Sequence, residues 1–179
     1  MEDLIKFFEY ISKLKLTVRT GWKMLKVKGG ETIGSHSFGT TFIAWLLAKQ
    51  KKLDVEKTIK MALIHDLIEG VTGDIAFVDE RHKIKSEIEG KAIPKLKKII
   101  PEEFRNEILN LIVELNEEKT EESKIVKEAD RLDTTIQAYF YKIINAGKFI
   151  EYAEDVCKKG YSKEILDYIK SIEENRKSK

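Results

Sequence analysis

A chain of 179 residues, of which 42% are hydrophobic and 36% charged, can bury the core of one domain and lacks the composition of a disordered protein. Its net charge of +2, without a basic run interleaved with aromatic residues, excludes the usual signature of a nucleic-acid-binding protein. The single cysteine, Cys157, excludes an intrachain disulfide and indicates a reducing compartment. Without a signal-like start or an apolar stretch of ~20 residues, the sequence predicts no membrane partner and a cytoplasmic location.

The first half of the chain predicts three helices, because apolar residues recur there at helical spacing. Their expected spans are residues 3–17, from Thr32 or Ser35 to Gln50, and from Asp54 to about Glu69. Thr32, Ser35 and Asp54 are suitable N-cap residues. Residues 17–34 break the pattern with several glycines and predict a long connecting loop, with a short extended piece at about 23–28. A loop of that length is often functional.

The second half predicts further helices and no strand. Their expected spans are residues 82–99, 101–116, 120–145, 148–158 and 162–175. Pro101 suits the first turn of a helix, and Thr120 is a suitable N-cap. The expected fold is therefore all-α, a single bundle of about seven to eight helices. We expect one domain over residues 1–179, with a core at about 1–147 and a C-terminal helical extension at about 148–176.

The segment Ala62-Leu-Ile-His-Asp-Leu-Ile-Glu-Gly-Val-Thr-Gly-Asp74 places ionisable side chains in a mostly apolar stretch. His65 and Asp66 are adjacent and can approach one ion from neighbouring directions, and Glu69 lies one helical turn later on the same side. Buried charge is costly unless it is paired or bound to a metal, so a divalent cation would stabilise this group. For the His-Asp dipeptide alone, a hydrogen bond without a metal is the simpler alternative.

Two more residues are ambiguous when each is taken alone. His36 stands near the start of a predicted helix, where it is readily explained as a partly buried polar residue. Asp130 lies inside the predicted helix of residues 120–145, where it is readily explained as a salt-bridge partner of Arg131 or of a nearby lysine. Neither residue alone predicts a metal site.

Together, and in this order along the chain, His36, His65-Asp66 and Asp130 resemble the H…HD…D pattern of the HD-domain superfamily of metal-dependent phosphohydrolases. The resemblance implies that these four side chains ligate one divalent ion. Two imidazoles and two carboxylates suit Mn²⁺, Co²⁺, Fe²⁺, Ni²⁺ or Zn²⁺. Such an ion would act as a Lewis acid on a phosphoryl group and would lower the pKa of its bound water.

Further matches resemble the 5′-deoxynucleotidase branch of that superfamily. They are Val18-Arg-Thr-Gly-Trp22, Glu31-Thr-Ile-Gly-Ser-His-Ser37, His65-Asp-Leu-Ile-Glu-Gly-Val-Thr-Gly-Asp74 and Val126-Lys-Glu-Ala-Asp130. The similarity covers roughly residues 1–145. Ser35 stands where the family commonly has glutamate, and Ile75 to Asp79 lack its proline-containing turn. These departures leave the metal site intact and bear on the identity of the substrate.

The same resemblance implies roles for residues around the metal. Arg19 would grip the substrate phosphate with its planar guanidinium, and Glu69 would act as the general acid/base. Asp74 would hydrogen-bond a sugar hydroxyl, and close packing there could exclude a 2′-hydroxyl. Trp22 would either stack on the base or cover the core, and the residues leave both alternatives open.

The expected function is hydrolysis of (deoxy)nucleoside 5′-monophosphates to nucleoside and phosphate by a metal-dependent phosphomonoesterase. One alternative keeps the metal and changes the substrate to a nucleoside triphosphate, a cyclic nucleotide or a guanosine polyphosphate. Triphosphates and polyphosphates would need more cationic groups than Arg19 and scattered lysines supply. Another alternative is a metal-stabilised helical binding module without turnover. The family also implies a homodimer, with Tyr152, Tyr161 and Tyr168 as candidate interface residues.

Overall fold

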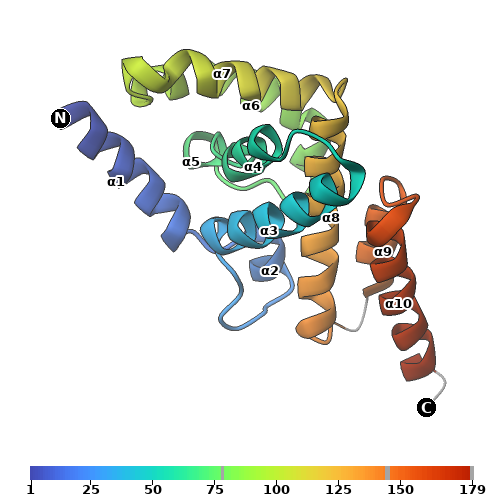
Figure 1. Cartoon of the computed structure of the whole chain (residues 1–179). Coiled ribbons are helices and arrows are strands. Elements are labelled where there is room, and N and C mark those ends of the chain that lie inside the picture. The colour runs from blue at the N-terminus through green and yellow to red at the C-terminus, as the bar shows by residue number, and fades with distance from the viewer. Residues whose placement is uncertain (78, 144–145, 178–179) are drawn as a thin grey trace. The chain divides into compact units, whose positions relative to one another are not determined.

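The computed structural model describes residues 1–77, 79–143 and 146–177, and helices dominate these ranges (Figure 1). The expected all-α fold is confirmed. Within the described ranges, the extended pairing is one antiparallel bridge between Val18 and Thr32. No helix in them combines the length and the apolar character that crossing a membrane requires.

The helices of the first part of the chain are α1 (Glu2–Leu16), α2 (Thr20–Met24), α3 (Ile33–Lys51), α4 (Val55–Ile64) and α5 (Glu69–Thr72). They are followed by the 3₁₀ helix η1 (Glu80–Ile84), α6 (Lys85–Ile99), α7 (Glu102–Glu117), α8 (Glu121–Phe140), α9 (Ala146–Glu154) and α10 (Gly160–Lys177). Three predicted N-caps are confirmed: the side chain of Thr32 accepts from Ser35 N (3.1 Å), that of Asp54 from Lys57 N (3.0 Å), and that of Thr120 from Ser123 N (3.3 Å).

The helix expected at residues 54–69 is broken in the structure. It ends at Ile64, and the chain then forms turns up to the short helix α5. Hydrogen bonds from Leu67 N to Ile64 O (2.9 Å) and from Glu69 N to Asp66 O (3.0 Å) close turns that are tighter than those of an α-helix. The apolar pattern runs on through the break, so the pattern alone predicted one helix.

Other differences are smaller. The loop expected at 17–34 contains α2 and the Val18–Thr32 bridge, and the extended piece expected at 23–28 is instead the end of α2 followed by turns. The helix expected at 82–99 begins as η1. The helix expected at 120–145 ends at Phe140, and residues 144–145 lie outside the described residues.

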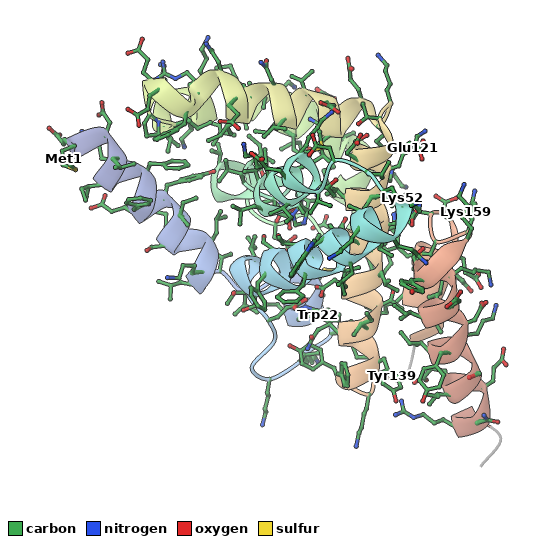
Figure 2. All side chains as sticks on the ribbon, in the orientation of Figure 1. Met1, Trp22, Lys52, Glu121, Tyr139 and Lys159 are labelled. Carbon is green, nitrogen blue, oxygen red and sulfur yellow. The ribbon has the colours of Figure 1, made fainter. Side chains whose placement is uncertain are left out.

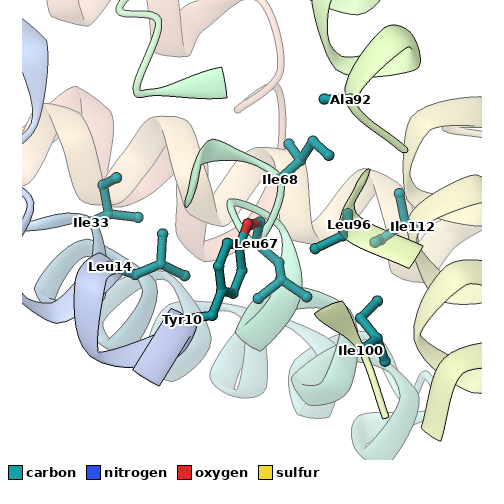
Figure 3. Packing of buried hydrophobic residues seen from close by; sticks show 9 residues of the cluster. All are labelled: Tyr10, Leu14, Ile33, Leu67, Ile68, Ala92, Leu96, Ile100 and Ile112. Atoms are coloured by element: carbon teal, nitrogen blue, oxygen red, sulfur yellow. The ribbon is translucent and has the colours of Figure 1, made fainter. Parts of the chain in front are cut away.

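The chain forms two compact units, Met1–Ser37 with Leu63–Val113, and Phe38–Ala62 with Glu114–Lys179. In the first unit, α1 packs on α5 and α6, and α5 packs on α6. The Tyr10 hydroxyl donates to Leu67 O (2.6 Å), which ties α1 to the turn before α5. Figure 3 shows nine core residues of this unit: Tyr10, Leu14, Ile33, Leu67, Ile68, Ala92, Leu96, Ile100 and Ile112.

In the second unit, α9 and α10 pack on α8 and on each other (Figure 1). The Nη1 atom of Arg131 donates to Tyr152 O (2.9 Å), and its guanidinium lies over the Tyr152 ring, 4.3 Å from the centroid. These contacts fasten α8 to α9. The core of this unit includes Leu132, Ile150, Ala153, Cys157, Leu166 and Ile169.

Candidate metal centre

Three of the predicted metal ligands meet in the first unit. The Nε2 atoms of His36 and His65 lie 3.3 Å apart. Asp66 Oδ2 lies 3.3 Å from His65 Nε2 and 3.8 Å from His36 Nε2. Ligand atoms bound to one ion at ~2.0–2.2 Å are themselves roughly 3 Å or more apart, so these three atoms have the spacing to hold one cation.

Local structure explains why these side chains converge. His36 lies in the first turn of α3, where its N–H donates to Thr32 O (3.0 Å) and the Thr32 hydroxyl accepts from Ser35 N (3.1 Å). His65 and Asp66 lie in the turn after α4, outside any continuous helix. In turns tighter than the α-helix, successive side chains are no longer separated by the ~100° of an α-helix. The side chains of His65 and Asp66 can therefore both lie beside the His36 ring.

The charge balance at this point suits a cation. His36 is completely buried, and Asp66 is nearly so. Burial by itself would raise the pKa of Asp66, but His65, His36 and Lys85 together outweigh it and hold the pKa of this carboxyl well below its ordinary value. An ionised carboxylate beside two imidazoles is the mixed nitrogen and oxygen donor set that suits divalent transition metals.

Glu69, the predicted acid/base, begins α5 and is 3% exposed. Lys85 Nζ donates to its Oε1 atom (3.1 Å), whereas Oε2 is buried without a hydrogen-bond partner among the described residues. Burial, and next the charge of Asp66, raise the pKa of Glu69 well above its ordinary value, and Lys85 opposes the shift only in part. A buried oxygen without a partner is costly, so Oε2 marks a place for a ligand group or a water molecule.

Arg19 and Trp22 share an acceptor for which the sequence predicted no role. Glu31 Oε1 accepts from Arg19 Nη1 (3.2 Å) and from Trp22 Nε1 (2.9 Å). Trp22, labelled in Figure 2, is only 2% exposed, so its ring belongs to the interior in this conformation. The contact of Trp22 with a substrate base stays a prediction.

Asp74, the predicted sugar-binding residue, is buried and bonded to the residue after Arg19. Its carboxylate accepts a hydrogen bond from Thr20 N, and its backbone oxygen accepts one from the Thr20 hydroxyl (3.1 Å). The structure thus holds Arg19 and Asp74 close together. Asp130 lies half-buried on α8 of the second unit, and its role as the fourth ligand stays a prediction.

Lys85 and Glu31 lie at this centre, and the sequence predicted no function for either residue. Lys85 lies in a segment rich in lysine and glutamate, so its residue type alone gave no signal of a functional role. Glu31 did stand in a matched motif, and its position in that motif was the signal that could have identified it.

Known proteins resemble this chain over most of its length. A family model described as the HD domain matches residues 11–173. The 5′-deoxynucleotidase HDDC2 of Danio rerio is 31% identical, over 98% of this chain and 89% of its own length. The 5′-deoxynucleotidase VV1113 of Vibrio vulnificus is 31% identical, over 70% of this chain and 69% of its own length.

Solved structures agree with these sequence matches. The PH0347 protein of Pyrococcus horikoshii OT3 aligns with a TM-score of 0.76 at 32% identity, covering 95% of this chain and 98% of that one. A conserved hypothetical protein of Pyrococcus furiosus aligns with a TM-score of 0.74 at 32% identity, covering 93% of this chain and 99% of that one.

Proposed function

This chain belongs to the HD-domain family, and from that premise we propose that it is a metal-dependent phosphomonoesterase that hydrolyses (deoxy)nucleoside 5′-monophosphates to nucleoside and phosphate. The observation that carries the proposal is the convergence of His36, His65 and Asp66 on one point. The names of its relatives in an animal and a bacterium, both 5′-deoxynucleotidases, support the choice of substrate class.

The proposed metal ligands are His36, His65, Asp66 and Asp130. When bound, a divalent ion such as Mn²⁺, Co²⁺, Fe²⁺, Ni²⁺ or Zn²⁺ would supply Lewis acidity to the phosphoryl group and activate a water molecule. His36, His65 and Asp66 already lie within 4.8 Å of one another through their ligand atoms, so these three donors would need little reorganisation when charge develops in the transition state.

Glu69 is the proposed acid/base. Its raised pKa favours the protonated form, and Oε2 is the oxygen that Lys85 leaves unbonded. A proton on Oε2 can pass to the departing 5′-oxygen of the nucleoside, which leaves as a neutral hydroxyl. Lys85 then stabilises the carboxylate that remains, because its ammonium group lies 3.1 Å from Oε1.

Arg19 and Asp74 are the proposed substrate-binding residues, with Trp22 as a further candidate. A guanidinium can donate two parallel hydrogen bonds to a phosphate. The hydrogen bonds between Thr20 and Asp74 keep the Asp74 carboxylate near Arg19, which supports a joint role of the two residues in binding sugar and phosphate. Arg19 and Asp74 would then hold the two ends of the deoxyribose 5′-phosphate while the phosphorus faces the metal ligands.

Three further expectations accompany this function. We propose that residues 1–179 form one HD domain, because the match to the family model runs through segments of both units. The cytoplasmic location and the homodimer stay predictions. Tyr161 and Tyr168 are exposed, as an interface on α10 would require of them.

A phosphate-release screen tests the proposed function. Purified protein is incubated with deoxy- and ribonucleoside 5′-monophosphates in the presence of Mn²⁺, Co²⁺, Mg²⁺ or Zn²⁺, with EDTA as the control. We expect metal-dependent release that is faster from the deoxy substrates. The same incubations with nucleoside triphosphates and cyclic nucleotides are analysed by chromatography of the nucleotide products, because opening a cyclic nucleotide releases no phosphate. Turnover of these compounds without turnover of monophosphates would overturn the proposed substrate class. No release from any phosphate ester would favour a binding module without turnover.

A further inference from the structure

Glu31 links the two predicted substrate-binding residues of the α2 segment. A single oxygen, Oε1, accepts hydrogen bonds from both the Arg19 guanidinium (3.2 Å) and the Trp22 indole (2.9 Å). The side chains of Arg19 and Glu31 are 16% and 9% exposed, so this ion pair is mostly shielded from water. Charge-assisted hydrogen bonds are stronger than neutral ones, and shielding strengthens them further.

The backbone fixes the same pair of segments. Arg19 N donates to Glu31 O (3.0 Å), and Ile33 N donates to Thr17 O (2.9 Å) around the Val18–Thr32 bridge. Because the segments are paired through their main chains, the Glu31 carboxylate reaches Arg19 without a long, flexible connection. The ordering cost of the ion pair is therefore small.

Trp22 gives this arrangement a rigid anchor. Its indole is buried, and it packs against Gly30, where an added Cβ would lie 2.7 Å from the Trp22 Cβ. Any larger residue at position 30 would displace the tryptophan or the turn. Trp22 is therefore held in place by packing, and its N–H in turn fixes the Glu31 carboxylate.

Glu31 also adjoins the metal centre. One of its carboxylate oxygens lies within 4.8 Å of a ring nitrogen of His36. On the other side of Arg19, Thr20 is bonded to Asp74 through both its N–H and its hydroxyl. Neighbouring groups thus run from His36 to Glu31, from Glu31 to Arg19, and from Thr20, the next residue, to Asp74.

We propose that Glu31 is a positioning residue that holds the Arg19 guanidinium beside the metal centre, in the orientation that receives the substrate phosphate. This inference rests on the proposed function. A guanidinium has five N–H donors in a planar fork, and the bond to Glu31 engages one of them, so the same contact that orients the fork is compatible with phosphate binding. Without Glu31, the arginine side chain would sample other rotamers and bind phosphate less often in the productive geometry.

A double-mutant cycle tests this role. Arg19→Ala, Glu31→Ala and the double variant are compared with wild type for kcat and KM on a deoxynucleoside 5′-monophosphate. Each single variant is expected to lower kcat/KM by about 10- to 100-fold, the effect of losing a charge-assisted hydrogen bond. The double variant should fall no further than Arg19→Ala, because Glu31 acts through Arg19. Multiplicative losses in the double variant would overturn the proposal.

Glu103→Ala is the matched control, because Glu103 is an exposed glutamate on α7 of the same unit. If Glu31→Ala does not fold, Glu31→Gln replaces it in the cycle. The amide keeps an oxygen acceptor for the indole and loses the charge that orients Arg19. A smaller loss that again vanishes in the Arg19→Ala background supports the proposal, and a loss that persists there contradicts it.

A second readout does not depend on turnover. The chain has two tryptophans, so in a Trp45→Phe background the fluorescence reports Trp22 alone. Glu31→Ala is expected to shift the Trp22 emission to longer wavelength, because the space left by the carboxylate admits water to the indole N–H, whereas Glu31→Gln fills that space and should cause a much smaller shift. An unchanged emission in a folded Glu31→Ala variant would show that the Trp22 indole does not fix the Glu31 carboxylate, and would contradict the proposal. This result stands even if the wild type releases no phosphate, so failure of the inference and failure of the proposed function are distinguishable.

Discussion

Two buried glutamates, one in each unit, make the same lysine contact and differ in what their other oxygen meets. In the first unit, Glu69 Oε1 lies 3.1 Å from Lys85 Nζ. In the second, Glu128 Oε1 lies 3.1 Å from Lys51 Nζ. The Oε2 atom of Glu128 accepts a hydrogen bond from the Ser162 hydroxyl (2.9 Å).

The Oε2 atom of Glu69, by contrast, is buried without a hydrogen-bond partner among the described residues. A buried polar network whose members are all hydrogen-bonded makes a core more rigid. A buried polar atom without a partner destabilises the folded state, so its presence calls for a reason other than stability. The difference indicates that Glu128 joins α3, α8 and α10 for stability, and it supports the proposal that one oxygen of Glu69 is used for chemistry. Substitution of Glu69 should therefore lower activity without lowering stability, whereas removal of the Ser162 hydroxyl beside Glu128 should lower stability without lowering activity.

The largest expected effect comes from disrupting the proposed metal site beside Glu69. Asp66→Asn replaces an ionised ligand with a neutral amide and should lower the rate of phosphate release by more than ~10⁴-fold, because an ion contributes several kcal/mol of transition-state stabilisation. Metal content measured by elemental analysis should fall with it. Asp3→Asn, at an exposed position of α1, is the control. Unchanged turnover in Asp66→Asn would remove Asp66 from the ligand set.

Glu69→Gln should lower kcat by roughly 10²- to 10⁴-fold while metal binding persists, because the amide cannot transfer the proton. Its free energy of unfolding should be unchanged or higher, since a buried group that resists ionisation has become permanently neutral. Both quantities are measured on the same preparation, by phosphate release and by denaturant unfolding.

Glu89→Gln is the matched control for that substitution, because Glu89 lies 3.6 Å from the same lysine, Lys85. Its kcat should stay within a few-fold of wild type. An equal loss of activity in Glu69→Gln and Glu89→Gln would show that the general charge near Lys85 matters, and that Glu69 has no special role.

Ser162→Ala would give Glu128 the unbonded oxygen that Glu69 already has. Leaving a buried acceptor without its partner costs about 1–3 kcal/mol, so the free energy of unfolding should fall by that amount with kcat unchanged. Ser171→Ala on the same helix removes an exposed hydroxyl and is the control. If Ser162→Ala instead lowers activity at unaltered stability, the contrast between the two glutamates is wrong.

The smallest effect concerns Cys157, whose thiol lies 3.8 Å from Glu128 O. Burial, and next the charge of Glu128, raise the pKa of Cys157 from 9.0 to about 11. The folded protein therefore binds more protons than the unfolded chain between these values, and the free energy of unfolding should fall as pH rises through this range. The expected contribution is about 1 kcal/mol between pH 8 and pH 10.

Cys157→Ala should lack this part of the pH dependence, so the difference between the two proteins isolates the thiol. Denaturant unfolding at pH 8 and pH 10 measures it. An equally steep fall in stability for Cys157→Ala would assign the pH dependence to other groups.

Particular residues show how far sequence reasoning reached. Asp54 and Thr120 cap the helices that they were expected to cap, because capping depends on neighbours within one turn. His36, His65 and Asp66 were identified by residue type and order, and the structure brings them together. The break after Ile64 was missed, because apolar spacing continues through residues 65–68 and only the packed fold selects the tighter turns.

The sequence by itself determined that the protein is helical, that it has the ligand types for a divalent metal, and which family it resembles. These are properties of residue type and short-range spacing. The tertiary structure decided that Lys85 binds one oxygen of Glu69 and that Glu31 joins Arg19 to Trp22. Such contacts join residues far apart along the chain, and whether a buried polar atom finds a partner depends on how those distant segments pack.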